Sequence, residues 1–223
     1  MVTLIPQILD SKALAEIHQR LDAGSFIDGK LSAGKEASKV KNNEELAPDT
    51  KSLDQLNNLV MGHLVQHPTY QSAALPLRVA APYYARYSKG MSYGEHVDDP
   101  VMGTTHRYRS DIAITIFLSN PETYDGGELV IRTEFGQQQV KLPAGDAVLY
   151  PASSLHQVKG VTKGERLVAV TWAQSMVRDP AQRELLYELS CARNELLESS
   201  PDNDTTALIS KSYVNLLRMW SEV

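Results

Sequence analysis

Hydrophobic residues recur every three or four positions in two stretches near the N-terminus, which is the spacing of one face of an α-helix. In the first stretch, residues 11–22, the apolar face consists of Leu14, Ile17 and Leu21. Asp10 precedes it in the position of an N-cap, where a carboxylate accepts a backbone N–H of the first turn. His18 lies beside this face and is interpreted as a structural residue.

The second helical stretch begins after Ser52, which has the spacing of a capping box with Gln55. Its apolar face consists of Leu53, Leu56, Val60 and Leu64. The helix is expected to end near His67-Pro68, because a residue before proline is pushed out of the α region. His63 and His67 have no partner at metal-ligand spacing and are interpreted as structural.

A polar, glycine-punctuated segment separates the two helices, over residues 23–49. Loops of this length in compact domains are usually lids, binding segments or disordered. The composition leaves a lid or substrate loop and plain disorder equally open, with a short strand expected at residues 25–27.

From residue 77 the pattern changes to short runs rich in β-branched and aromatic residues, separated by turn signals. Paired glycines in Tyr124-Asp-Gly-Gly-Glu128 predict a tight turn, since glycine accepts positive φ. The runs predict an antiparallel β-sandwich or jelly roll with helices packed outside. The expected strands are residues 77–79, 82–84, 111–118, 128–132, 139–142, 147–150 and 166–172.

Two further helices are expected at the C-terminus. Asp179-Pro180 places a capping acid before a proline at the first helical position. The matched spacing of the two apolar faces predicts an antiparallel helical hairpin, packed on the outside of the sandwich or forming a contact in a homo-oligomer. The faces are Leu185, Leu189, Ala192 and Leu196, then Ile209, Tyr213, Leu216 and Trp220.

Composition and charge exclude several classes of protein. The 223 residues are 42% hydrophobic and 22% charged, as in an ordinary globular chain, and the net charge of −5 argues against a nucleic-acid surface. No apolar run reaches the roughly 20 residues of a membrane helix. Cys191 is the one cysteine, so no intramolecular disulfide can form and a cytoplasmic location is expected.

Candidate chemistry begins with His96-x-Asp98. Residues two apart on a strand point to the same face, so this pair can present an imidazole and a carboxylate to one point. Two histidines and one carboxylate form the facial triad that holds non-haem Fe(II) and leaves positions open. His156 can supply the second imidazole if antiparallel strands bring it beside the pair.

Arg166 opens the apolar run of the last predicted strand. A fixed cation is costly in such a place unless it pairs with an anion, and the planar guanidinium suits a carboxylate. The sequence therefore predicts a metal, open positions and a carboxylate-binding group in one cavity.

These residues resemble the Fe(II)- and 2-oxoglutarate-dependent dioxygenases, in particular the PKHD-type hydroxylases of the prolyl-4-hydroxylase-like branch. The resemblance extends over nearly the whole chain. It rests on the series Tyr87, Gly90, Tyr93, His96 and Asp98, the turns at 125–129 and 145–146, the pair His156 and Arg166, and the N-terminal residues 28–30, 33–34 and 40–43.

The resemblance implies a double-stranded β-helix core and a role for each residue. His96, Asp98 and His156 would bind iron, Arg166 would bind the distal carboxylate of 2-oxoglutarate, and Tyr87 would donate its hydroxyl to the same group. The implied reaction consumes O2, hydroxylates a C–H bond, and releases succinate and CO2. Some members of the family are also associated with L-ascorbate and with iron uptake.

The substrate is expected to be a small molecule or a peptide. The expected organisation is an N-terminal region over residues 1–76, the dioxygenase core over residues 77–177, and a C-terminal helical region over residues 178–223. Two alternatives remain open: a non-catalytic sensor of iron or 2-oxoglutarate, and a cupin-like metal enzyme that does not use 2-oxoglutarate. Substrate contacts are expected from residues 23–49 and from Arg107 or Arg109, whereas His106 is a weak candidate for a ligand.

Overall fold

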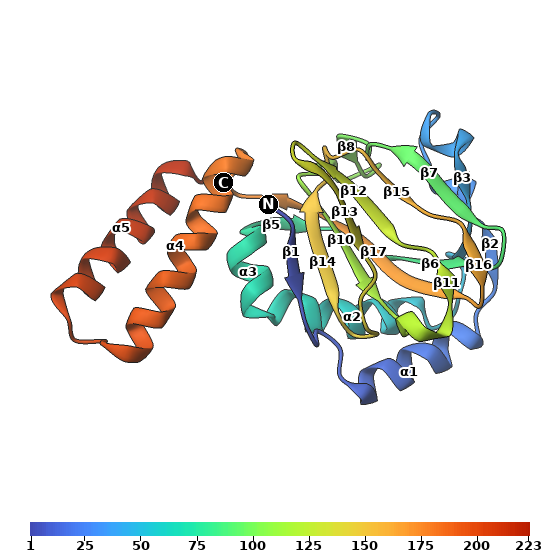
Figure 1. Cartoon of the computed structure of the whole chain (residues 1–223), viewed down its shortest axis with the longest axis horizontal. Helices are drawn as coiled ribbons and strands as arrows, with labels where there is room; N and C mark the ends of the chain where they lie inside the picture. The colour runs from blue at the N-terminus through green and yellow to red at the C-terminus, as the bar shows by residue number, and fades with distance from the viewer.

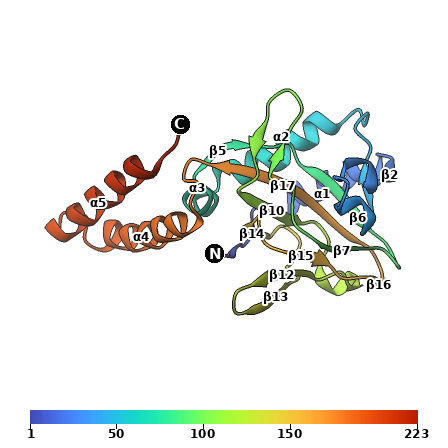
Figure 2. The same ribbon diagram turned by 90° about the horizontal axis from the view of Figure 1, so that it is seen from above.

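A computed structural model describes all of residues 1–223 and shows two antiparallel sheets that face each other (Figures 1 and 2). The larger sheet lies against three helices, and its long strand β17 pairs with three neighbours. In spatial order this sheet contains β1 (Thr3–Ile5), β14 (Ala147–Pro151), β10 (Ile112–Phe117), β17 (Arg166–Ser175), β6 (Tyr83–Tyr87), β4 (Glu44–Leu46) and β2 (Phe26–Asp28), with β5 (Pro76–Val79) beside β17.

The smaller sheet covers the other side and completes the jelly roll. Its spatial order is β13 (Gly136–Val140), β12 (Leu129–Thr133), β15 (His156–Val158), β7 (Ser92–His96) and β3 (Lys41–Asn42). Two short ribbons flank the sheets: β8 (Val101–Met102) with β9 (Tyr108–Arg109), and β11 (Asp125–Gly126) with β16 (Val161–Lys163). The tight turn is confirmed, with Gly126 and Gly127 at φ of 75° and 68°.

The larger sheet is buried on both faces, which explains why every residue of β10 is buried and all but Thr115 are apolar. Ile112, Ile114 and Ile116 face the helices, whereas Ala113 and Phe117 face the smaller sheet. Successive side chains of a strand point to opposite faces, so one strand contributes to two separate cores. The prediction of a sandwich with external helices is confirmed.

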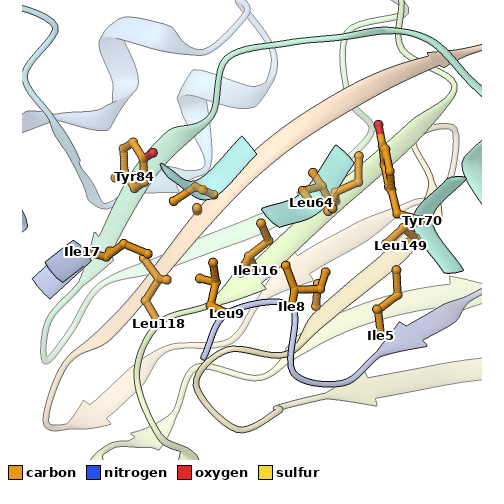
Figure 3. Close-up of a cluster of buried hydrophobic side chains, with 14 of the residues drawn as sticks. Ile5, Ile8, Leu9, Ile17, Leu64, Tyr70, Tyr84, Ile116, Leu118 and Leu149 are labelled. Atoms are coloured by element: carbon orange, nitrogen blue, oxygen red, sulfur yellow. The ribbon is translucent and has the colours of Figure 1, made fainter. Parts of the chain in front are cut away.

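Helices α1 (Ser11–Asp22), α2 (Leu53–Gln66) and α3 (Pro68–Ala74) cover the larger sheet. Figure 3 shows part of the core between them, where Ile17 and Leu64 from the helices meet Ile116 and Leu149 from the strands. The predicted cap of α1 is confirmed, since Asp10 accepts the backbone N–H of Ala13 at 2.7 Å.

The predicted capping box of α2 is wrong. The side chain of Ser52 makes no capping hydrogen bond, because its backbone, at φ −97° and ψ 7°, is not in the extended conformation that aims a hydroxyl at the first turn. The helix does end before Pro68, as expected. His67 has a role that the sequence analysis missed: its Nδ1 accepts the backbone N–H of Thr69 at 3.3 Å and caps α3.

The segment between α1 and α2 is ordered and contributes to both sheets. It contains β2, two short 3-10 helices, η1 (Gly29–Ser32) and η2 (Ala37–Lys39), and then β3 and β4. β3 pairs with β7 of the smaller sheet, and β4 pairs with β6 of the larger one. The chain therefore crosses from one sheet to the other between Lys41 and Leu46.

The C-terminal helices α4 (Pro180–Ser199) and α5 (Asp204–Trp220) form the predicted antiparallel hairpin. Both views show it extending away from the sheets (Figures 1 and 2). One detail is wrong: Leu186 is the buried leucine of α4, packed with Leu75 and Val177, and the predicted Leu185 is 56% exposed. None of the five α-helices combines the length and the hydrophobicity needed to cross a membrane.

Candidate metal centre

Strand pairing brings the predicted donor residues together. β7 and β15 are neighbours in the smaller sheet, and His96 lies directly opposite His156 in their register. Asp98 follows β7 by two residues. This one antiparallel pairing therefore brings together two histidines that lie 60 residues apart in the sequence.

The three side chains converge on one point. Asp98 Oδ1 lies 3.9 Å from His96 Nε2 and 3.8 Å from His156 Nε2. One ligand atom from each of the three residues lies within 4.8 Å of the others. This spacing lets one ion contact all three atoms at ordinary metal–ligand distances, which are about 2.0–2.2 Å.

Backbone carbonyls fix the orientation of both imidazoles. His96 Nδ1 donates to the carbonyl oxygen of Gly94 at 2.8 Å, and His156 Nδ1 donates to that of Ser154 at 2.9 Å. A carbonyl oxygen can only accept, so Nδ1 carries the proton and Nε2 presents a lone pair to the centre. The ring of Tyr93 stacks on His96 with centroids 3.7 Å apart and restrains it further.

Burial keeps His96 in the neutral form that a metal requires. It lowers the pKa of His96 to about 4, assisted by the neighbouring His156. Burial also raises the pKa of Asp98, against the opposing effects of His156 and of a hydrogen bond from Trp172. A divalent cation would supply the positive charge that this carboxylate otherwise lacks.

Trp172 is a residue of the site that the sequence analysis did not identify. Its indole Nε1 donates to Asp98 Oδ2 at 2.8 Å, which leaves Oδ1 directed at the two histidines. The available signal was its even spacing from Arg166 on the same strand, which places both residues on one face. Only the tertiary structure shows what that face contacts.

Arg166 is buried, with 1% exposure, and no carboxylate of the protein pairs with it. Its guanidinium lies 5.1 Å from the ring centroid of Tyr87, which is its register partner on β6, and 5.5 Å from that of Phe117. Its Nε has no hydrogen-bond partner. A buried cation without an anion is unfavourable, so this position fits an anionic ligand.

Tyr87 stands beside this guanidinium as a hydrogen-bond donor. Burial raises its pKa to about 12, against the opposing effect of Arg166, so the hydroxyl keeps its proton at neutral pH. Gly127 leaves room for the arginine, since a Cβ there would lie 3.1 Å from Arg166 Cδ. The residues present therefore fit both a divalent metal and a dicarboxylate.

One cavity of about 1150 Å³ contains the donor set and Arg166. Its wall includes residues from 27 to 48, so the N-terminal segment contributes to the site. His106 also lines the cavity but does not belong to the donor set. Arg107 and Arg109 do not line it, contrary to expectation, and Arg109 instead pairs with Asp111 at 2.6 Å.

Comparison with known proteins places this geometry in a family. Residues 82–174 match the 2OG-Fe(II) oxygenase superfamily, and residues 180–222 match the PKHD-type hydroxylase C-terminal domain. The chain is 52% identical over 224 residues to a PKHD-type hydroxylase of Thioalkalivibrio sulfidiphilus, with all of both chains covered.

Solved structures share the fold at lower identity. A prolyl hydroxylase from Trichoplax adhaerens, in complex with a peptide fragment of hypoxia inducible factor, is 16% identical with a TM-score of 0.54, covering 82% of this chain and 86% of that one. HygX from Streptomyces hygroscopicus, with nickel, 2-oxoglutarate and hygromycin B bound, is 14% identical with a TM-score of 0.51, covering 79% and 84%.

Proposed function

The chain belongs to the 2OG-Fe(II) oxygenase superfamily, among its PKHD-type hydroxylases, and from this membership we propose that it hydroxylates a C–H bond of a small molecule or peptide. It is a 2-oxoglutarate-dependent dioxygenase, with Fe(II) and 2-oxoglutarate as cofactor and co-substrate. The proposed reaction converts substrate C–H, 2-oxoglutarate and O2 into substrate C–OH, succinate and CO2.

The observation that carries the proposal is the convergence of His96, Asp98 and His156 in the cavity that also holds Arg166. The three converging residues would hold Fe(II), which supplies the oxidising chemistry when bound. The carbonyls of Gly94 and Ser154 keep both imidazoles turned toward the point where the three side chains converge.

Arg166 and Tyr87 would bind the distal carboxylate of 2-oxoglutarate. The guanidinium provides a charge-assisted contact, and the tyrosine hydroxyl adds a neutral donor. They line the same cavity as His96, Asp98 and His156, so a co-substrate bound to them would be directed toward the three metal ligands. The walls would hold the substrate beside the metal and exclude bulk water, which is the protein's usual contribution to cofactor chemistry.

The proposed working compartment is the cytoplasm, because the one cysteine, Cys191, is a free thiol. An association with iron uptake rests on the family resemblance alone.

The test is succinate formation by purified protein with Fe(II), 2-oxoglutarate and O2, with and without candidate substrates. His96→Ala and Asp98→Ala are expected to abolish turnover, because each removes a metal ligand. His106→Ala is the matched control, since it removes a histidine of the same cavity that lies outside the donor set. Tight binding of Fe(II) and 2-oxoglutarate without succinate or O2 consumption would contradict the proposal and favour a sensor.

A further inference from the structure

Three polar side chains face inward from one short segment of the N-terminal region. Lys41, Asn43 and Glu45 are buried, with 6%, 4% and 8% exposure, whereas Asn42 and Glu44 between them are not buried. Alternate residues of an extended chain face the same side. The segment therefore behaves as a strand with a polar inner face, the reverse of the usual pattern.

This segment forms the cavity wall where the two sheets meet. Lys41 pairs in register with Tyr93 of the smaller sheet, and Glu45 pairs with Ala85 of the larger sheet. Asn43 lies at the crossing between them. All three line the cavity that contains the metal centre.

The ammonium group of Lys41 already has partners within the protein. Its Nζ lies 2.5 Å from Glu45 Oε1 and donates to Ser32 Oγ at 2.9 Å. It also lies 5.3 Å from the ring centroid of Tyr93, which stacks on His96. The cation is therefore held in place and has little capacity left for a ligand.

Glu45 and Asn43 have unused hydrogen-bonding capacity. No protein group donates to the second carboxylate oxygen of Glu45, and neither polar atom of the Asn43 amide has a partner. An unpaired buried amide costs free energy, so a ligand group that bonds to Asn43 and to the free carboxylate oxygen of Glu45 is expected to bind here.

The charge on this wall favours a cation. Asp28 and Asp99 also line the cavity, and the Asp99 carboxylate lies beside Gly34 of the same N-terminal segment. The cavity lining as a whole contains four carboxylates, these two with Glu45 and Asp98, and three cations, Lys41, Arg78 and Arg166. Lys41 is already paired with Glu45, and Arg166 is assigned to the co-substrate. A wall with an excess of one charge attracts the opposite charge.

Aromatic side chains connect this wall to the metal centre. Glu45 stands opposite the small Ala85, with Tyr83 and Tyr87 at the diagonal positions of β6. The Tyr83 ring packs against Trp172 with centroids 6.0 Å apart, and Trp172 donates to Asp98. A carboxylate flanked by aromatic faces is a combination that binds ammonium groups.

We infer that Glu45 is a substrate-recognition residue that binds an ammonium group, so that the substrate is an amine-bearing molecule or peptide. The inference rests on the proposed function, because it identifies the substrate class of that same cavity. The amine would sit at Glu45 while a carbon of the same substrate lies beside Trp172 and the metal centre.

Binding is measured by NMR on the Mn(II)-loaded protein with 2-oxoglutarate under nitrogen, where the absence of O2 prevents turnover. The paramagnetic ion broadens the signals of a probe bound near it. The probes are Nα-acetyl-lysine amide, its Nε-acetylated form, which lacks the charge, and Nα-acetyl-glutamate amide. The lysine probe is expected to bind about tenfold or more tightly than either of the others, as a charge-assisted hydrogen bond would give.

Two test variants and one control variant assign the effect to Glu45. Glu45→Gln is expected to weaken the lysine probe about tenfold or more, since it removes the charge but keeps the size. Glu44→Gln is the matched control, because that carboxylate pairs with Arg86 and does not line the cavity. The double variant Lys41→Glu/Glu45→Lys keeps an ion pair but exchanges the two charges. It is expected to bind the glutamate probe more tightly than the lysine probe.

Equal binding of the lysine probe and its acetylated form by the unmodified protein would overturn the inference. So would an exchange variant that keeps the original preference, because the pair would then be purely structural. If neither variant folds, the comparison of probes on the unmodified protein decides alone. Iron-dependent succinate formation is measured separately: its absence contradicts the proposed function, whereas its presence without a preference for amines contradicts this inference alone.

Discussion

The two oxygens of Asp98 have different surroundings. Oδ1 faces the imidazoles of His96 and His156, whereas Oδ2 accepts the indole N–H of Trp172. This hydrogen bond stabilises the ionised carboxylate and selects the oxygen that a metal would meet. Trp172 is thus expected to act as a positioning residue through Asp98.

Trp172→Phe is expected to weaken Mn(II) or Fe(II) binding by about tenfold, the lower end of the usual effect of such outer contacts. Removal of the hydrogen bond raises the pKa of Asp98 further above its ordinary value. More carboxylate is then protonated as the pH falls, so the loss of affinity should be larger at pH 6 than at pH 8. The measurement is a metal titration at both pH values.

Tyr83→Phe provides the control, because Tyr83 packs against Trp172 whereas the hydrogen bond to Asp98 comes from Trp172. If Trp172→Phe lost the same metal affinity at pH 6 as at pH 8, the indole would act through packing and not through the carboxylate of Asp98.

Arg166 offers a second prediction at the residue scale. Arg166→Met is expected to raise the Kd of 2-oxoglutarate by about 30-fold or more, since it removes one partner of a buried charged contact. The same change should not lower the free energy of unfolding of the ligand-free protein, because a buried guanidinium without an anion is itself unfavourable. Calorimetric titration and urea unfolding give the two quantities.

Lys141→Met is the matched control, because Lys141 lies over the ring of Tyr124 outside the cavity. An unchanged Kd in Arg166→Met would exclude this arginine from co-substrate binding.

At the scale of single elements, two helix starts that look alike in the sequence differ in the structure. Asp10 and Ser52 both precede an apolar helical repeat. Asp10 has extended backbone, at φ −77° and ψ 172°, and its carboxylate bonds to the first turn. Ser52 has another backbone conformation and makes no such bond.

Asp10→Ala is expected to lower the free energy of unfolding by about 1 kcal/mol, the usual cost of losing an N-cap. Ser52→Ala should change it by less than about 0.5 kcal/mol, because no hydrogen bond is lost. Urea unfolding of both variants measures the difference. A comparable loss in the two variants would contradict this assignment of the caps.

At the scale of the whole molecule, the C-terminal hairpin is joined to the sheets through a small apolar cluster. Leu186 of α4 is fully buried against Leu75, at the end of α3, and Val177, just beyond β17. Tyr187 of the same helix packs against the core between the larger sheet and the N-terminal helices, whereas no residue of α4 or α5 belongs to the core between the two sheets. Docking of the hairpin and assembly of the metal centre therefore depend on different residues.

Leu186→Ala is expected to lower the free energy of unfolding by about 2–4 kcal/mol through loss of buried surface and a residual cavity. Leu185→Ala, its exposed neighbour, should stay within about 0.5 kcal/mol of the unmodified protein. Neither change should alter the Mn(II) affinity. A loss of metal binding in Leu186→Ala, under conditions where the variant is folded, would show that the hairpin does influence the site.

The sequence by itself determined the properties that depend on local spacing and on chemical type. Period 3.6 and period 2 identified helices and strands, and the proline at position 68 marked the end of α2. The donor set of His96, Asp98 and His156 followed from residue type and from the resemblance. Arg166 followed because a cation that opens a buried strand requires an anion.

The tertiary structure alone decided which faces of these elements are buried and by what. Leu185 and Leu186 fit the helical period almost equally. Leu186 is the one that is buried, because it packs against Leu75 and Val177. The inward direction of Lys41 and Glu45 depends on pairing with strands that lie far along the chain. Such contacts arise from long-range register, which local hydrophobic patterns do not encode, so the polar wall of the cavity could not be predicted from the sequence.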